Sequence, residues 1–185
     1  MSELLDLLKQ RNSSARLENP APGPGALREM IAAALRAPDH AWLRPWRFIT
    51  IAGERRAAFG AELERCLLAR EPQADTAARD KARNAPLRAP LVLVVVARLC
   101  QHPKVPALEQ RLSAGCAAQA ILLAAQAQGY AGIWRTGEAA FDPAVMAALG
   151  LAEAEEIIGF LYLGTRSGAA KPLPELDPDD FLSQW

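Results

Sequence analysis

The stretch Leu91-Val-Leu-Val-Val-Val96 decides how this chain folds. It holds six consecutive apolar residues, and β-branched side chains of this kind pack well in an extended strand. Because successive side chains of a strand point to opposite faces, an unbroken apolar run predicts a strand that is covered on both faces. We therefore expect a central strand with further elements packed on each side of its sheet.

The segments around this strand predict alternating helices and strands. Apolar periodicity indicates helices near residues 4–11, 27–35, 54–70, 75–84, 113–128 and 142–149, and strands near 47–51, 130–135 and 157–163. Residues 17–25 are interpreted as a loop. This order predicts an α+β fold, one domain over residues 1–185, in which a small mixed sheet is flanked by helices. The proline-rich tail from about 168 to 185 ends in Phe181-Leu182-Ser-Gln-Trp185, so we expect it to dock on another surface.

Composition excludes several classes of protein. The formal net charge is zero, whereas a general nucleic-acid binder is usually basic. The N-terminus shows no signal-peptide pattern and no apolar run has membrane-spanning length, so we expect a cytoplasmic protein with no membrane partner. The odd number of cysteines and the lack of a CxxC spacing argue against disulfides and zinc, and two histidines exclude a His-rich metal site. No dinucleotide fingerprint, P-loop or GxSxG elbow is present.

The stretch Arg36-Ala-Pro-Asp-His-Ala-Trp-Leu-Arg-Pro-Trp46 is unusual for a connecting loop. Turn chemistry favours Gly, Asn, Ser and Asp and does not explain aromatic residues beside cations. Together with Arg11-Asn12-Ser13 and Trp134-Arg135-Thr136, this loop indicates a site for a flat anionic ligand, and a flavin fits that description. Each segment also has a structural interpretation: a basic helix end for Arg11, a loop-holding hydrogen bond for His40 and a core position for Trp46.

Several short blocks in the same order resemble the nitroreductase flavoproteins, and within them a short bacterial subgroup of NAD(P)H nitroreductases. The resemblance covers essentially the whole chain. It implies an α+β sandwich that forms an intertwined homodimer, with two FMN molecules at the dimer interface and each FMN held by both chains. In such a dimer we expect the C-terminal tail to dock on the partner chain. The blocks are Gln10–Leu17, Arg36–His40, Pro45-Trp46, Asp80–Pro86, Arg88–Pro90, His102–Pro106, Ser113–Cys116, Gly132–Arg135 and Gly159–Thr165.

The resemblance also implies roles for individual residues. Arg11, Asn12 and Ser13 would hold the phosphate end of FMN, and Arg36 and His40 would contact the same flavin. Residues of the partner chain would complete the site, and they are Trp134, Arg135 and Thr136. In the subgroup, one segment is assigned to NAD(P) binding. The residues of this chain that match it are Ala124, Ala125, Gln126, Ala127, Gln128 and Gly129. Neither a catalytic side chain nor a metal ligand is implied.

Two departures from the family pattern bear on the site. Asn12 stands where the family often has a second arginine, so one positive charge near the phosphate is lost. Asp39, Trp42 and Arg44 stand where the family commonly has Ser, Asn and Gln, which predicts a different flavin environment and substrate pocket.

The activity implied is hydride transfer from NAD(P)H through FMN to a nitroaromatic, a quinone or a similar small acceptor. Arg135 is the candidate for a positive charge near the flavin N1 side. The alternatives are another reduction on the same fold (dehalogenation or enoyl-type), an FMN storage or delivery protein with little turnover, and a dimeric module without a cofactor.

Overall fold

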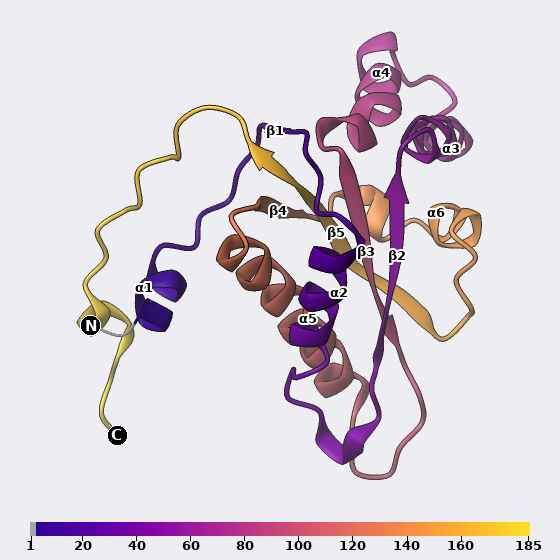
Figure 1. The fold of residues 1–185 in the computed structure, drawn as a ribbon. Coiled ribbons are helices and arrows are strands. Elements are labelled where there is room, and N and C mark those ends of the chain that lie inside the picture. Colours follow the sequence, from indigo (N-terminus) through magenta and orange to yellow (C-terminus); the bar gives the residue numbers. More distant parts are fainter. Residues whose placement is uncertain (1–2) are drawn as a thin grey trace.

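Strand β3 (Leu91–Arg98) lies inside the sheet, between β2 (Trp46–Ala52) and β5 (Glu155–Arg166), in the computed structural model, which describes residues 3–185 (Figure 1). Residues 91–97 of β3 are all buried. The prediction of a central strand covered on both faces is therefore confirmed, and its cause is the unbroken apolar run.

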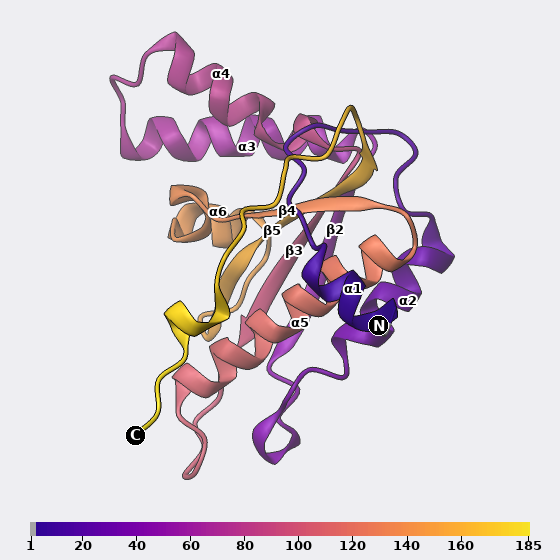
Figure 2. The same cartoon turned by 90° about the vertical axis from the view of Figure 1, so that its left-hand side faces the viewer.

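The five-stranded sheet has the order β1-β5-β3-β2, where β1 is Leu17–Glu18, and β4 (Ala131–Arg135) also pairs with β5. These strand pairs are all antiparallel, although the sequence order led us to expect a mixed sheet. A parallel pairing occurs outside the named strands, as an isolated bridge between Ser13 and Gly132. For β2 and β3 the reason lies in the hairpin of α3 (Arg55–Arg70) and α4 (Thr76–Asn84), which returns the chain to the end of the sheet that it left (Figure 2). The sequence pattern also does not predict the short strand β1.

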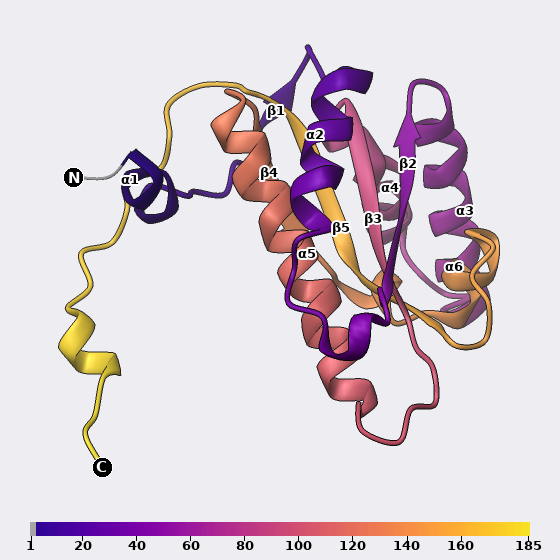
Figure 3. The same ribbon diagram turned by 60° about the horizontal axis from the view of Figure 1, so that its bottom comes forward.

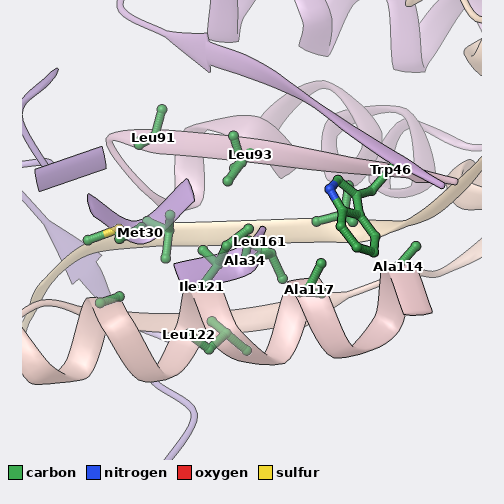
Figure 4. Close-up of a cluster of buried hydrophobic side chains, with 14 of the residues drawn as sticks. Met30, Ala34, Trp46, Leu91, Leu93, Ala114, Ala117, Ile121, Leu122 and Leu161 are labelled. Carbon is green, nitrogen blue, oxygen red and sulfur yellow. The ribbon is translucent and has the colours of Figure 1, made fainter. Parts of the chain in front are cut away.

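Two layers of helices cover the sheet (Figure 3). Helices α2 (Pro24–Ala34) and α5 (Ala107–Ala127) pack on the face that carries Leu91, Leu93 and Val95 (Figure 4). Helices α3, α4 and α6 (Pro143–Ala148) pack on the face that carries Val92 and Val94. The alternation of side chains along β3 thus divides the apolar residues into two cores.

Helix α5 begins six residues earlier than its apolar pattern predicts. Its first turns carry Leu108 and Leu112 on the exposed side, 62% and 59% accessible, which breaks the apolar pattern expected of a buried helix. Gln110 is buried in the same turns. Its side-chain amide accepts a hydrogen bond from Cys100 N at 2.9 Å and donates to Cys100 O at 2.9 Å, which anchors the loop between β3 and α5.

Helix α1 (Glu3–Lys9) and the segment 167–185 stand apart from the two-layered body (Figures 1 and 3). Helix α1 has no buried residue, and the C-terminal segment is exposed nearly throughout, including the short helix η4 (Pro178–Phe181). The large apolar side chains exposed on the two segments include Leu4, Leu5, Leu8, Leu173, Leu176, Phe181, Leu182 and Trp185. Within residues 3–185, none of the helices combines the length and apolar character needed to cross a bilayer.

The ion pair between Arg47 and Glu155 is expected to make the fold acid-sensitive. Arg47 donates from Nε and Nη2 to the two carboxylate oxygens of Glu155, at 2.6 Å each, and this pairing lowers the pKa of Glu155 from 4.5 to about 2. Because the folded-state pKa lies below the unfolded one, the stabilisation is complete above about pH 4.5 and is lost as the pH falls toward 2. At about 1.4 kcal/mol per pKa unit, the pair contributes roughly 3 kcal/mol at most at neutral pH.

Urea unfolding at pH 7 and pH 3 measures this effect. We expect Glu155→Gln to lower the free energy of unfolding at pH 7 and to reduce the difference between the two pH values. If the variant loses as much stability between pH 7 and pH 3 as the parent protein does, Glu155 is not the group responsible.

Candidate functional site

Arg11 and Ser13 lie side by side just beyond α1, along the start of β4. Ser13 bridges to Gly132, and Ser14 N donates a hydrogen bond to Gly132 O at 3.0 Å. The Arg11 guanidinium makes a long contact of 3.4 Å with Ser13 Oγ, and no acidic side chain within residues 3–185 pairs with it. A guanidinium and a hydroxyl are thus held together with most of their hydrogen-bonding capacity unused, and a phosphate would suit both groups.

Asn12 fastens the C-terminal segment beside this pair. Its Nδ2 donates a hydrogen bond to Lys171 O at 2.6 Å. The amide that stands in place of a second arginine therefore holds the beginning of the tail, which a guanidinium pointing at a phosphate would not do.

Trp134 and Arg135 end β4 and point to opposite faces of the sheet. Trp134 packs with the α5 side of the core, and its Nε1 donates to Ile158 O at 3.3 Å. Arg135 lies over the ring of Tyr162, with 5.6 Å between Cζ and the ring centroid, and its Nε is buried without a hydrogen-bond partner. One ligand on one face therefore cannot contact both side chains, and Arg135 has an unused donor.

Thr136 follows β4 and lines a hollow of about 490 Å³ between α3, α4, α6 and the short helices η2 (Ala85–Arg88) and η3 (Glu138–Ala140). Lys81 and Arg88 line the same hollow. Burial raises the pKa of the Tyr162 hydroxyl, while Arg135 and Arg88 act in the opposite direction. Sequence reasoning missed Lys81, Arg88 and Tyr162, although all three fall in blocks that carry the family resemblance.

The Arg36–Trp46 loop has a strained backbone. Ala41, Trp42 and Arg44 all adopt left-handed φ angles, at 62°, 55° and 49°, which side chains other than glycine rarely do. The carboxylate of Asp39 accepts hydrogen bonds from Leu43 N at 3.1 Å and Arg44 N at 2.8 Å. Asp39 therefore holds the turn through both of its oxygens, which explains an acid at this position.

The aromatic and histidine side chains of this loop separate into core and surface positions. Trp46 is 6% exposed and belongs to the α5-side core, so its structural interpretation is correct, while Trp42 is 79% exposed. His40 Nδ1 lies 2.8 Å from Glu109 Oε2, so a carboxylate of α5 orients the imidazole in place of the backbone bond considered from the sequence.

Within one chain, the loop and the Arg11–Ser13 pair lie at opposite ends of α5. His40 contacts Glu109 near the beginning of that helix, and Gln126 near its end donates to Leu7 O at 3.1 Å, close to the turn that leads into Arg11. Seventeen residues at about 1.5 Å each separate these contacts by roughly 25 Å. The bridge between Ser13 and Gly132 instead brings β4 beside Arg11 in the same chain, whereas the resemblance implies that Trp134–Thr136 come from the partner.

The segment Ala124–Gly129 forms the last turn of α5 and its exit. Gln126 holds α1 through Leu7, and Gln128 Nε2 donates to Ala26 O of α2 at 3.3 Å. Gly129 adopts a left-handed φ of 80° where the helix ends. The two amides are thus engaged in fastening α1 and α2 to α5, and the geometry gives this segment a structural role. No group of three His, Cys, Asp or Glu side chains gathers as a metal site in the described part of the chain.

Comparisons with known proteins agree on one family. The sequence pattern of the "Nitroreductase family" matches residues 8–165. The protein named "Putative NAD(P)H nitroreductase YdjA" from Escherichia coli (strain K12) is 46% identical over 184 residues, which is 99% of this chain and 100% of that protein. The protein named "Putative NAD(P)H nitroreductase" from Haemophilus influenzae is 37% identical over 185 residues, 98% of each chain.

Solved structures share the fold at low sequence identity. A nitroreductase-like family protein from Bacillus cereus aligns with a TM-score of 0.84 at 19% identity, over 100% of this chain and 97% of that one. The FMN and NADPH-dependent nitroreductase NfnB from a Sphigopyxis species gives 0.79 at 18%, over 100% and 99%. A nitroreductase with bound FMN from Bacteroides fragilis gives 0.74 at 22%, over 96% of each chain. The predicted nitroreductase-like α+β fold is thereby confirmed.

Proposed function

Because this chain belongs to the nitroreductase family, we propose that it is an FMN-dependent oxidoreductase. It would pass a hydride from NAD(P)H through FMN to a nitroaromatic, a quinone or a similar small acceptor. The observation that carries the proposal is the Arg11–Ser13 pair, a cation and a hydroxyl held together without an acidic partner among the residues 3–185. The names of the relatives, with NAD(P)H and bound FMN, support it.

The residues around the proposed cofactor fit an anionic flavin. Arg11 and Ser13 would bind phosphate oxygens through charge-assisted and hydroxyl hydrogen bonds. Arg135 would place its positive charge near the N1 side of the flavin ring, which favours the reduced, anionic form. FMN itself supplies the two-electron redox chemistry, and the protein supplies position and electrostatics. Because the flavin carries the redox chemistry, the protein does not need an acid–base pair of its own for this reaction.

We propose that two chains build each flavin site. The position of His40 and of the α1 end at opposite ends of α5 supports a division in which Arg11, Ser13 and the end of β4 belong to one chain, and Arg36 and His40 belong to its partner. The resemblance also implies two chains per site. It differs in taking Trp134–Thr136, at the end of β4, from the partner of the chain that supplies Arg11. The hydrogen bonds of Gln126 and Gln128 give no support to a nucleotide site at Ala124–Gly129, and we assign NAD(P)H to the exposed side of the flavin.

Anaerobic mixing of the purified protein with NADH or NADPH tests the proposed function. We expect a yellow protein whose flavin absorbance bleaches with at least one nucleotide and returns when a nitroaromatic or quinone is added. A flavin that is bound but never bleached would replace the oxidoreductase with a storage protein. A colourless protein that takes up no added FMN would exclude both.

We propose further that residues 1–185 form one domain whose tail, residues 168–185, docks on the partner of a homodimer. The relative accessible surface areas of Phe181, Leu182 and Trp185 are 76%, 74% and 119%. These residues lie on a segment that contacts little of its own chain. Leu108 and Leu112 at the start of α5 are also exposed. Burial of apolar surface of this kind drives most protein association.

Phe181→Ala is expected to weaken the dimer at least tenfold, because a phenylalanine buried at an interface contributes about 2 kcal/mol. Sedimentation velocity across a dilution series measures this change, and flavin absorbance in the same runs shows whether the monomer keeps FMN. The matched control is Phe141→Ala, which removes another exposed phenylalanine, 72% accessible, outside the tail. A dimer weakened equally by both variants, or a flavin-loaded monomer, would contradict the arrangement.

A further inference from the structure

The Arg36–Trp46 loop encloses a hollow of about 320 Å³, a size within the range of small-molecule sites. Guanidiniums, indoles and one carboxylate line it. The residues that supply these groups are Arg36, Asp39, Trp42, Arg44 and Trp46.

The lining of the hollow carries net positive charge, because two guanidiniums face one carboxylate. Neither Arg36 nor Arg44 has a side-chain hydrogen bond or an ion pair within residues 3–185. Asp39 is the one acid in the lining, and both of its oxygens already accept backbone N–H groups of the turn. The neighbouring imidazole of His40 is engaged with Glu109, outside the lining.

Trp46 and Trp42 supply the aromatic part of the lining. The Trp46 side chain is 94% buried, yet its Nε1 has no hydrogen-bond partner among the described residues. Trp42, 79% exposed at the rim, offers a flat face on which an aromatic ring can stack.

We propose that this hollow is a subsite for the carboxylate of an aromatic electron acceptor. The guanidinium of Arg44 can bind a carboxylate through two parallel hydrogen bonds, and Arg36 adds a second positive charge to the lining. The proposal rests on the proposed function, which puts Arg36 and His40 beside the flavin. Arg44 stands where the family commonly has a neutral glutamine, so this chain in particular is suited to acceptors such as nitrobenzoates.

A pair of acceptors that differ only in charge tests the subsite. The ratio of kcat/KM for 4-nitrobenzoate to that for methyl 4-nitrobenzoate is expected to fall about tenfold or more in Arg44→Gln, because a charged hydrogen bond is lost. Glutamine, like arginine, is not glycine, so the substitution changes the side chain and leaves a non-glycine residue at this left-handed backbone position. Arg55→Gln is the matched control: Arg55 begins α3, is exposed and has no partner among the described residues, so the ratio should stay as it is.

A binding measurement gives a readout that does not depend on turnover. The chain has four tryptophans, so their indole N–H signals can be followed by NMR while benzoate is added to the purified protein. We expect the Trp46 signal to shift with saturation, and the shift to require a much higher benzoate concentration in Arg44→Gln. Trp46→Phe assigns the signal; if that variant does not fold, single substitutions of the other three tryptophans assign it by elimination.

The possible outcomes separate the subsite from the rest of the site. An unmoved Trp46 signal, or an unchanged acid-to-ester ratio in Arg44→Gln, would overturn the proposal. A loss of FMN affinity in Arg44→Gln without a change of the ratio would assign the hollow to the flavin phosphate, and a loss of NADPH relative to NADH would assign it to the nucleotide phosphate. If the protein neither binds FMN nor oxidises NAD(P)H, the proposed function fails, whereas the Trp46 titration still reports on the anion site.

Discussion

Gly159→Ala should destabilise the protein and disturb the proposed flavin site together. A Cβ at this position of β5 would overlap Nε1 of Trp134 and come within 2.6 Å of its Cδ1, and it would also lie 3.1 Å from Arg135 O. The indole of Trp134 must therefore leave its place over the strand. Overpacking of this kind costs roughly 2–3 kcal/mol, which corresponds to a fall in Tm of roughly 4–12 °C for a chain of this size.

Calorimetry and FMN titration measure the two effects. The matched control is Gly115→Ala in α5, where the added Cβ would lie 3.7 Å from the same indole, an ordinary contact. Because alanine favours a helix over glycine, this control should keep or raise the Tm. In a Trp134→Ala background, Gly159→Ala should cost much less, since the side chain it collides with is gone. An equal cost in both backgrounds would show that the indole is not the reason for the glycine.

Arg11→Ala should weaken FMN binding about tenfold to a hundredfold. The guanidinium beside Ser13 has no acidic partner within residues 3–185, so its hydrogen bonds are available for a phosphate. A hydrogen bond to a charged group contributes roughly 1.5–3 kcal/mol. Because Arg11 is only partly buried and supports no core contact, the Tm of the flavin-free protein should change little.

Quenching of FMN fluorescence during titration measures the affinity. Arg11→Lys separates charge from geometry: it keeps the positive charge but loses the planar, two-pronged contact, so its affinity should fall between those of the parent and of Arg11→Ala. Arg55→Ala removes a remote exposed arginine and should leave FMN binding as it is. An unchanged affinity in Arg11→Ala would remove this residue from the flavin site.

Local sequence pattern predicted most of the elements, because the apolar period differs between helix and strand. The run at Leu91–Val96 indicated a strand with two covered faces, and the amphipathic segments indicated the helices around it. The prediction was weaker where an element is not apolar along its length. The first turns of α5 expose Leu108 and Leu112, and β1 has two residues, too few for any period. The predicted mixed sheet was wrong, because strand direction depends on the connections between strands, such as the α3–α4 hairpin between β2 and β3, and not on any one strand.

The residues of the candidate site were likewise predicted only in part. Arg11 and Ser13 were selected because a guanidinium and a hydroxyl suit a phosphate and because the resemblance implies that role, and the structure holds them together. Lys81, Arg88 and Tyr162 were not selected, since an isolated arginine, lysine or tyrosine carries no periodic signal. They become candidates only because the fold brings Lys81 and Arg88 to the hollow that Thr136 lines, and stacks Tyr162 against Arg135.

The amino-acid order alone thus determined the family, the α+β class and a central strand buried on both faces, since these depend on residue types at short spacing. Only the tertiary structure decided which residues share a site. It put Trp134 and Arg135 on opposite faces, placed the contacts of the Arg36–Trp46 loop and of α1 at opposite ends of α5, and gave Asp39 its hydrogen bonds within a strained turn. Such relations depend on distances between segments far apart in the chain, and those distances are set by the packing of helices on the sheet.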